Sequence, residues 1–326
     1  MKIPSEIANA VTILRSGGLV AIPTETVYGL GADARNPTAV GKIFTAKQRP
    51  ASHPLIVHLS DPSEITDWAR EVPVAALQLA KAFWPGPLTL ILKKRPTVLD
   101  SVTAGQDTVA LRIPRHPVAL ALLRAFGSGL VAPSANRFTR VSPTTAEAVQ
   151  AELGDRVDCI LDGGPCEVGL ESTILDMSGA EPRILRPGMI SAEAIGKVLG
   201  GPVEVFRQDH PTEVRAPGMH HLHYAPTTRT ELLATKQLQQ LTTTMPVVCL
   251  TYSGSPLPEN AHCQHIQMPA NPADYAQQLY ATLRAQDQQQ YQCIYIEAVP
   301  ESTEWDAIRD RLAKASGGRH QPNEGR

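Results

Sequence analysis

Apolar and polar residues alternate along the first part of the chain with two different periods. Apolar side chains at positions 7, 10, 11 and 14 fall on one face of a helix, and the glycine pair at 17–18 ends that pattern. The apolar run at 19–22 predicts a short buried strand that Pro23 ends. A second helix is indicated from Pro37 towards Lys47, because Asn36 is a favoured cap and proline suits the first turn.

Strands and helices continue in alternation. Apolar runs predict strands at 55–59, 88–92, 108–113, 130–132 and 157–161, and helical spacing predicts helices from Asp61-Pro62 and at 73–83, 117–126 and 145–153. The last helix is expected to begin at Thr144, because Thr144 and Glu147 have the spacing of a capping box. This order predicts an α/β or mixed α+β fold, with a twisted mixed sheet in a domain covering residues 1–206.

The pattern changes after residue 206. Residues 207–228 contain two proline-containing turns and four histidines with little periodicity, and we interpret them as a long linker or lid. Beyond it, strands are predicted at 245–251 and 293–297, and helices at 272–284 and 304–315. Residues 229–326 are therefore expected to form a second, smaller Rossmann-like α/β domain. It lacks a GxGxxG loop, which argues against a dinucleotide site there.

The composition is that of an ordinary globular protein, with 326 residues, 42% hydrophobic and 19% charged. A formal net charge of −2 gives no global basic field that would attract nucleic acid. Five widely spaced cysteines without a CxxC pair predict free thiols in a reducing compartment. The sequence shows neither the apolar core of a signal peptide nor an apolar run of membrane-spanning length, so we expect a cytoplasmic protein without membrane contact.

Five polar clusters could carry chemistry. The first, PTETVYGLGADA at 23–34, places hydroxyls and the carboxylate of Glu25 after a strand, where open α/β sheets usually bind ligands. The alternative is a glycine-rich turn with internally satisfied threonines. In the second cluster, Lys47 and Arg49 could neutralise a polyphosphate, or could form a solvated helix end that complements the helix dipole. His58 stands in an apolar strand, where the usual explanation is a core histidine with satisfied hydrogen bonds.

The other three clusters contain cations and hydroxyls. Arg112 interrupts the apolar strand VALRI, and a buried charge requires a partner or an anionic ligand. The fourth cluster joins residues 132–136 to 142–144, and the fifth joins 171–173 to 185–188; turn chemistry is the alternative for both. The chain has no GxSxG elbow, no Walker A loop and no zinc-ligand spacing. The set suits a site that positions an anionic substrate and stabilises a phosphoryl transition state.

The order of these motifs resembles a known family. GGLVAIPTETVYGLGADA, KQRP, HPLIVH, FWPGPLT, VALRIPRHP, APSAN, ESTI and ILRPG follow one another as in the YrdC-like threonylcarbamoyl-adenylate synthases, and PGMHHLHYAP with the second domain resembles the long form of that family. Hydrogenase-maturation carbamoyltransferases share the domain but carry acylphosphatase-like and zinc-finger segments that this chain lacks. An RNA-binding module without catalysis is the other alternative, against which the near-neutral charge argues.

The resemblance implies a nucleotidyltransferase that uses ATP, L-threonine and bicarbonate. The threonine amine takes up bicarbonate or CO2 to give a carbamate, whose oxygen attacks the α-phosphorus of ATP and expels diphosphate. Mg2+ is expected to arrive with ATP, without a metal cage in the protein. The product, threonylcarbamoyl-AMP, would pass to a tRNA threonylcarbamoyl transferase complex. The resemblance leaves direct tRNA binding open.

The resemblance also implies roles for individual residues. Lys47 and Arg49 form the pair expected to act in catalysis at the phosphates. His53 stands where many relatives have a polar residue such as Asn. The threonine site is expected to use Thr26, His58, Arg112, Ser172 and the backbone of Ala132, and the ATP site Arg49, His53, Thr108, Ser134, Ser142, Arg186 and Tyr224.

The linker departs from the family pattern, which often reads PGMKYRHYAP. Here His220, His221 and Leu222 replace the Lys, Tyr and Arg, whereas His223 and Tyr224 remain. We interpret the segment as a lid that brings His221, His223 and Tyr224 to ATP or the adenylate and excludes water from the carbamate and the mixed anhydride. A simple tether and a metal site on the closely spaced histidines are the alternatives.

Overall fold

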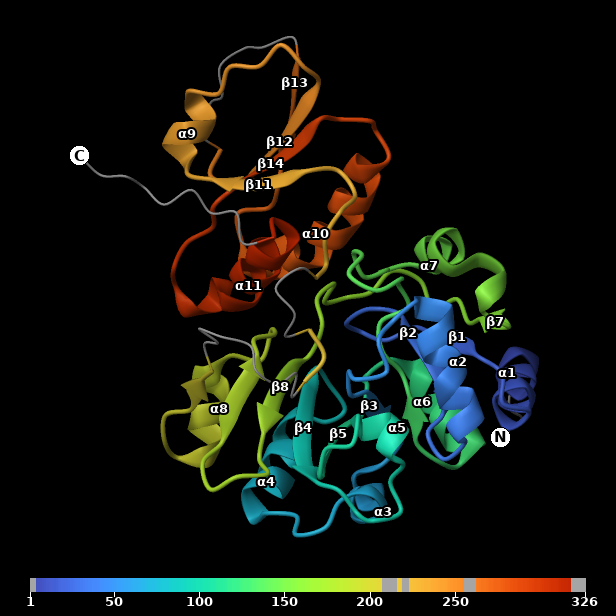
Figure 1. The fold of residues 1–326 in the computed structure, drawn as a ribbon. Coiled ribbons are helices and arrows are strands. Elements are labelled where there is room, and N and C mark those ends of the chain that lie inside the picture. The colour runs from blue at the N-terminus through green and yellow to red at the C-terminus, as the bar shows by residue number, and fades with distance from the viewer. Residues whose placement is uncertain (1–3, 207–215, 219–222, 255–261, 318–326) are drawn as a thin grey trace. The chain divides into compact units, whose positions relative to one another are not determined.

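The computed structural model describes residues 4–206, 216–218, 223–254 and 262–317. The chain divides into two compact units, the first made of residues 1–138 and 142–219 and the second of residues 139–141 and 220–326. Each unit has its own sheet (Figure 1). Residues 207–215 and 219–222 of the predicted linker lie outside the described residues, so the predicted boundaries at 206 and 228 stay predictions.

The first unit contains a 10-stranded sheet with the strand order β10-β9-β8-β4-β5-β3-β6-β2-β1-β7. Neighbouring strands β3 and β5 run parallel, whereas β4 and β5 run antiparallel, so the sheet is mixed as predicted. The strands are β1 (Val20–Ile22), β2 (Gly29–Asp33), β3 (Ile56–His58), β4 (Leu88–Lys93), β5 (Thr108–Arg112), β6 (Leu130–Val131), β7 (Cys159–Ile160), β8 (Thr173–Asp176), β9 (Arg183–Arg186) and β10 (Glu204–Val205).

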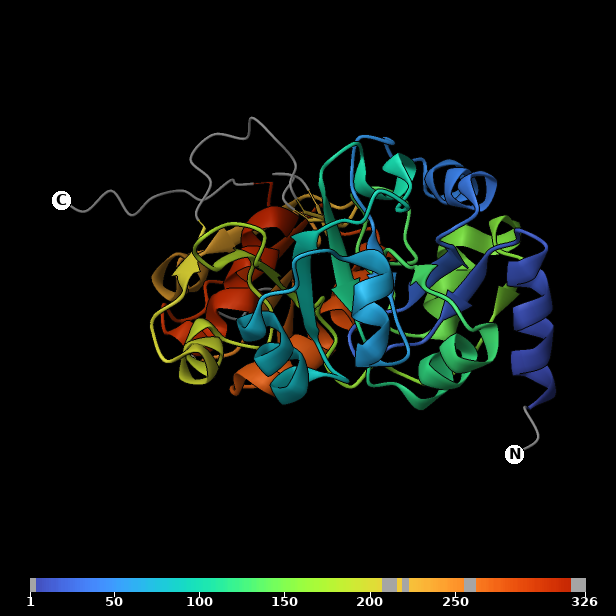
Figure 2. The same cartoon turned by 90° about the horizontal axis from the view of Figure 1, so that it is seen from below.

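Helices pack on both faces of this sheet (Figure 2). Helices α2, α4 and α8 bury apolar side chains in the main core cluster, whereas α1 and α6 pack together in a separate cluster. Ala21 of β1 belongs to the first cluster and its neighbours Val20 and Ile22 to the second, so the two clusters lie on opposite faces. The helices are α1 (Ser5–Arg15), α2 (Pro37–Lys47), η1 (Pro62–Glu64), α3 (Ile65–Trp68), α4 (Val74–Phe83), α5 (Asp100–Thr103), α6 (Pro117–Phe126), α7 (Ala146–Leu153), η2 (Gly154–Arg156) and α8 (Ala192–Leu199).

The second unit is a smaller α/β unit. Its sheet has the order β11-β14-β12-β13, and all three strand pairs are parallel, which confirms the predicted Rossmann-like pattern. The strands are β11 (Thr230–Leu233), β12 (Val247–Thr251), β13 (Cys263–Gln267) and β14 (Cys293–Glu297). The helices are α9 (Thr235–Gln239), α10 (Pro272–Asp287), η3 (Thr303–Trp305) and α11 (Asp306–Ala315).

Helix starts depend on local capping. The side chain of Asn36 accepts hydrogen bonds from the amides of Thr38 and Ala39, so the predicted start of α2 is confirmed. The predicted start of α7 at Thr144 is wrong by one residue, because Thr145 caps the helix by accepting from the amide of Ala148. Thr144 is instead buried, and its carbonyl oxygen accepts a hydrogen bond from the amide of Cys166.

Strand β2 was not expected from the pattern. It has the sequence GLGAD, in which two glycines lower the strand propensity, and it forms because it pairs with β1 on one side and β6 on the other.

The cysteines are free thiols, as predicted. Among the helices that the structure describes, none has the length and apolar character that crossing a membrane requires.

Candidate active site

Side-chain alternation along the central strands places polar residues on one face of the first sheet. In β3, β4 and β5, every second residue belongs to the main core cluster, so the residues between them point to the opposite face. We call this opposite face the site face. The core residues are Val57, Leu88, Leu90, Leu92, Val109 and Leu111; the site face carries Ile56, His58, Thr89, Ile91, Thr108, Ala110 and Arg112.

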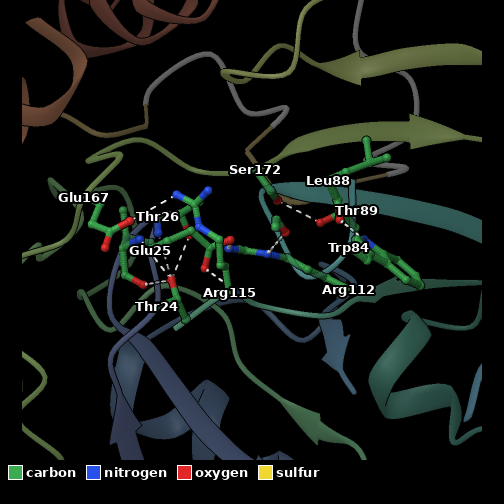
Figure 3. Close-up of polar contacts among 12 residues, drawn as sticks. Thr24, Glu25, Thr26, Trp84, Leu88, Thr89, Arg112, Arg115, Glu167 and Ser172 are labelled. Carbon is green, nitrogen blue, oxygen red and sulfur yellow. Dashed lines mark hydrogen bonds and ion pairs between the residues drawn. The ribbon is translucent and has the colours of Figure 1, made fainter. Parts of the chain in front are cut away.

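Arg112 forms a buried ion pair on the site face. Its Nη2 donates to Oε1 of Glu25 at 2.7 Å, and its Nε donates to the carbonyl oxygen of Gly86 at 3.2 Å. The other oxygen of Glu25 accepts from the amide of Arg115 at 3.0 Å, as Figure 3 shows. The sequence predicted a partner or an anionic ligand for Arg112, and Glu25 is that partner. These bonds use two of the five guanidinium N–H donors, which leaves donors for a ligand.

The two threonines beside Glu25 have different roles. The hydroxyl of Thr24 donates its single proton to the carbonyl oxygen of Val27 at 2.6 Å. In the 2.8 Å contact between the two hydroxyls, the proton must therefore come from Thr26. Thr24 is satisfied within the turn, as the alternative for this segment predicted. The buried Thr26 keeps only acceptor lone pairs, which suit an N–H or O–H donor of a ligand.

His58 lies directly beside Arg112 in the sheet. The two residues are register partners in the parallel pair of β3 and β5. His58 is buried, and its Nδ1 has no hydrogen-bond partner among the described residues, so it is not a core histidine with both nitrogens satisfied. Burial and the neighbouring Arg112 lower the pKa of His58 to about 3, so its imidazole is neutral at pH 7. Next to it, the amide of Ala132 donates to the carbonyl oxygen of Ile56 at 3.1 Å.

Ser172 connects the predicted threonine and ATP residues. Its hydroxyl lies 2.8 Å from the hydroxyl of Thr89. Arg186 donates from Nη2 to the hydroxyl oxygen at 3.1 Å and from Nε and Nη2 to the carbonyl oxygen of Ser172 at 3.1 and 3.0 Å. The chain after Arg186 passes close to this point, since a Cβ on Gly188 would lie 2.3 Å from the amide nitrogen of Thr173. Glycine is therefore required at Gly188.

Lys47 and Arg49 are only 1% and 8% exposed, which excludes the solvated helix end considered as their alternative. Nζ of Lys47 donates to the carbonyl oxygens of Ser134 and Asn136, both at 2.5 Å. Burial and the charge of Arg49 hold the pKa of Lys47 well below its usual range. Arg49 donates from Nη2 to the carbonyl oxygen of Pro54 at 2.9 Å. Both cations are thus held by backbone carbonyls in a desolvated position, where an anionic ligand would offset their charge.

Three further predicted ATP residues of the first unit have contacts of their own. The His53 ring packs edge-on against Phe138, with 5.2 Å between ring centroids. The hydroxyl of Ser142 donates to Oε1 of Glu171 at 2.6 Å. Thr108 lines a cavity of about 10 Å³, room for a single water molecule, that Pro54 and Pro217 also line.

Tyr224 is placed in the second unit. Its ring stacks on Tyr280 with 5.9 Å between centroids, and the guanidinium of Arg311 lies 5.0 Å from the ring centre. The His223 ring packs edge-on against Tyr224 at 4.1 Å. Contact of Tyr224 with ATP stays a prediction. His220, His221 and Leu222 lie outside the described residues.

Sequence reasoning did not assign a role to three polar residues that hold the site together. Glu25 fixes Arg112, Thr89 contacts Ser172, and Glu171 contacts Ser142. Charge complementarity between Glu25 and the lone cation of an apolar strand was the available signal for the first. Thr89 stands inside LTLIL, and nothing in the sequence distinguishes it from an ordinary strand threonine. Within the described residues, no three histidine, cysteine or carboxylate side chains come together as a metal site.

Comparison with known proteins gives two family models that follow each other along the chain. Residues 12–188 match the model described as telomere recombination, which covers the YrdC-type domains, and residues 190–317 match the model described as threonylcarbamoyl-AMP synthase, C-terminal domain. A threonylcarbamoyl-AMP synthase of Bacillus subtilis is 41% identical over 96% of this chain and 94% of its own length. One of Schizosaccharomyces pombe is 39% identical over 96% and 88%.

A solved structure agrees with these relatives. The crystal structure of Pyrococcus abyssi Sua5 complexed with L-threonine superimposes with a TM-score of 0.89 at 38% identity, over 96% of this chain and 94% of that one. The sequence matches and the fold thus cover both units of the chain. The chain therefore belongs to the threonylcarbamoyl-AMP synthase family, in the form that carries the C-terminal domain.

Proposed function

We propose that this protein is a nucleotidyltransferase that condenses L-threonine, bicarbonate or CO2 and ATP to threonylcarbamoyl-AMP and diphosphate. The observation that carries the proposal is the buried pair of Glu25 and Arg112 beside the neutral His58. A carboxylate that holds an arginine leaves the guanidinium fixed in direction and supplied with spare donors. Such a group suits the carboxylate of a small amino acid, which it can bind with two parallel hydrogen bonds.

The remaining threonine contacts follow from donor and acceptor capacity. Thr26 offers acceptor lone pairs to the amine or hydroxyl of the substrate, because its own proton goes to Thr24. Ser172 and the backbone of Ala132 complete the set that the resemblance assigns. His58 supplies one unpartnered ring nitrogen and no charge, so it can orient the substrate without repelling the ammonium group.

Lys47 and Arg49 are the residues proposed to assist the reaction at the phosphates of ATP. The threonine nitrogen forms a bond to the carbon of CO2 and loses a proton. When bicarbonate is the source, a bond from that carbon to oxygen also breaks and water leaves. An oxygen of the resulting carbamate then bonds to the α-phosphorus, the bond from that phosphorus to the bridging oxygen breaks, and diphosphate leaves with the electron pair. Two desolvated cations stabilise the charge that develops on the phosphates. No protein nucleophile is needed.

ATP enters this scheme as its Mg2+ complex. The resemblance implies that the triphosphate, rather than a protein cage, would hold this metal. Arg186, through its bonds to Ser172, links the nucleotide to the threonine site. His53, Thr108, Ser134 and Ser142 complete the proposed ATP contacts of the first unit, and the resemblance adds Tyr224.

The first described part of the linker has contacts that support its interpretation as a lid. Ala216 is fully buried in an apolar cluster with five side chains of the first sheet, namely Ile56, Ile91, Ala110, Ile174 and Leu185. The carbonyl oxygen of Pro217 accepts a hydrogen bond from Nη1 of Arg186 at 3.2 Å. This segment therefore covers the site face beside a proposed ATP residue. Excluding water there protects the carbamate and the mixed anhydride from hydrolysis.

The mixed anhydride must pass to a second enzyme. We propose that a tRNA threonylcarbamoyl transferase complex accepts it in the cytoplasm and that this chain itself contributes little to holding tRNA. The formal net charge of −2 provides no general attraction for a polyanion.

Release of diphosphate tests the proposal. The purified chain is incubated with MgATP, L-threonine and bicarbonate, and then with each one omitted, and threonylcarbamoyl-AMP is identified by mass spectrometry. Product is expected only with all three substrates. Diphosphate formed equally well without threonine would reject the proposal. Absence of product together with a tRNA mobility shift would favour the RNA-binding alternative.

A further inference from the structure

Three residues inside the sequence of the first unit belong to the second. Thr139, Arg140 and Val141 cluster with residues 220–326, although Phe138 before them and Ser142 after them belong to the first unit. The segment lies within the loop that joins β6 to α7. The loop also contains the proposed ATP residues Ser134 and Ser142, so what holds residues 139–141 bears on the site.

The second unit holds this segment through backbone groups. The amide of Ala225 donates to the carbonyl oxygen of Thr139 at 2.9 Å, and Arg140 and Ala225 form a parallel β-bridge. The side chain of Arg284 donates from Nη2 to the carbonyl oxygen of Val141. Both ends of the three-residue segment are therefore fixed by groups of the second unit.

One face of helix α10 organises these contacts. Tyr280, Arg284 and Asp287 follow the spacing i, i+4 and i+7, which puts them in a row along the helix. Tyr280 stacks on Tyr224 of the linker. We call this row the α10 face.

The end of the α10 face binds the linker a second time. Asp287 accepts hydrogen bonds from the amides of Thr227 and Thr228 at 2.9 and 2.7 Å. The row therefore fixes linker residues on both sides of Ala225, the residue that pairs with Thr139. Between these two anchors, Arg284 holds the loop itself at Val141.

Residues of the same loop on both sides of this segment are held in the first unit. The amide of Phe138 donates to the carbonyl oxygen of Lys47 at 2.8 Å, and Nζ of Lys47 binds the carbonyl oxygens of Ser134 and Asn136. After the segment, Ser142 binds Glu171. Four residues of chain span at most about 14 Å. A restraint on residues 139–141 is therefore transmitted to Phe138 and Ser142 through the covalent chain.

We propose that Arg284 is a positioning residue for the ATP site. In this proposal the role of the second unit is to fix the loop 134–142 through the α10 face. The inference rests on the proposed function, which puts Ser134 and Ser142 against ATP. Arg284 does not act on substrate directly. It holds Val141, and through Val141 it sets where the hydroxyl of Ser142 stands. Loss of Arg284 should therefore affect ATP binding and not threonine binding, because the proposed threonine-site residues Thr26, His58 and Arg112 lie on other segments.

The chain offers a matched control for this arginine. Arg309 of α11 is also a half-buried arginine of the second unit, and it also donates to a backbone carbonyl oxygen, that of Pro300 at 2.7 Å. It has no bond to residues 139–141 among those described. Arg284→Met and Arg309→Met remove the same donors and keep the apolar stem. Arg284→Lys returns one charged donor.

Steady-state kinetics in the full-length chain decide the proposal. Arg284→Met is expected to raise KM for ATP by about 10- to 100-fold, the range for a small misplacement of a binding group, without changing KM for L-threonine. Arg284→Lys is expected to recover part of the loss, and Arg309→Met to behave as the parent protein. Threonine binding by calorimetry reports that the first unit is folded in each variant.

Two outcomes overturn the inference. KM for ATP may stay the same in folded Arg284→Met, or it may rise equally in Arg309→Met, which would mean a general loss of stability. If Arg284→Met cannot be purified folded, the KM for ATP of Arg284→Lys alone decides, since an unchanged value rejects the role. The parent protein in the same assay separates this result from the proposed function, because that function fails only if the parent makes no threonylcarbamoyl-AMP.

Discussion

Glu25 and Glu297 are buried carboxylates near strand ends, one in each unit, and the two have different surroundings. Glu25 of the first unit and Glu297 at the end of β14 are both 1% exposed. Glu297 accepts hydrogen bonds from the hydroxyl of Thr235 at 2.7 Å and from the amides of Tyr252 and Ser253 at 2.9 and 3.1 Å. Burial raises the pKa of Glu297, but these hydrogen bonds outweigh it and hold the pKa below its usual range.

The two carboxylates differ in whether the polar groups around them keep hydrogen-bonding capacity for a ligand. Around Glu297, neutral donors of neighbouring loops fill the carboxylate, and it has no arginine or lysine ion-pair partner within the described residues. Around Glu25, the partner is Arg112, which keeps spare donors and lies beside a histidine nitrogen without a partner. A parallel α/β sheet often binds ligands at its strand ends. In the second unit, Glu297 at the end of β14 occupies that position with its acceptor oxygens already filled; in the first, Arg112 and His58 keep groups that could bind a substrate.

Removing the carboxylate of Glu25 is expected to have the largest effect on stability and activity. Glu25→Ala leaves Arg112 buried without its partner, which should destabilise the first unit by about 3–5 kcal/mol and abolish threonine turnover. Urea unfolding and diphosphate release measure the two quantities. A variant as stable and as active as the parent would show that Arg112 does not depend on Glu25.

Removing a phosphate cation should reduce catalysis more than stability. Arg49→Ala is expected to lower kcat/KM by about 2–4 kcal/mol of transition-state stabilisation, and Lys47→Ala by a similar amount. Lys47 also holds Ser134 and Asn136, so its variant should lose some stability as well. Kinetics on folded variants check the prediction. Unchanged kcat/KM in Arg49→Ala would remove this cation from the proposed mechanism.

The buried histidine makes the first unit sensitive to acid. The folded protein holds the pKa of His58 at about 3, against about 6.5 in an unfolded chain, so unfolding takes up a proton below pH 6.5. Stability is fully present above pH 6.5 and falls by about 2 kcal/mol between pH 7 and pH 5. Urea unfolding in a Trp305→Phe background, where only tryptophans of the first unit report, measures it. His58→Gln should lose this part of the pH dependence; an identical slope would contradict the account.

The smallest effect is expected in the second unit. Glu297→Gln keeps one acceptor oxygen but loses the charge that two amides and a hydroxyl bind, so the second unit should lose about 1 kcal/mol of stability. The kcat and both KM values should stay as in the parent. A selective rise in KM for threonine would mean that the two carboxylates do not differ as described.

Local signals predicted the parts of the fold that local chemistry determines. Asn36 and Pro37 fix the start of α2, and the apolar run at 293–297 coincides with β14. Strand β2 could not be predicted, because pairing on both sides rather than propensity makes GLGAD a strand. The choice between Thr144 and Thr145 as cap depends on a contact of Thr144 with Cys166, which is distant in sequence.

The sequence predicted candidate site residues but not the contacts among them. A lone arginine in an apolar strand requires a partner, yet that partner stands 87 positions away, and only the fold brings the two together. The burial of Lys47 also depends on the fold, because the loop at 134–136 closes over a helix end that the sequence alone leaves open to water. Motif order, rather than periodicity, indicated the family.

Calorimetric titration of L-threonine decides whether the buried pair of Glu25 and Arg112 belongs to the threonine site. Three proteins are compared: the parent, Glu297→Gln, and the double variant Glu25→Gln with Arg112→Gln, which removes both buried charges together so that neither is left alone. We expect the same Kd for the parent and Glu297→Gln, and binding weaker by about 10- to 100-fold in the folded double variant, which corresponds to the loss of a hydrogen-bonded charge. Equal threonine affinity in the parent and the double variant would contradict the assignment of the site.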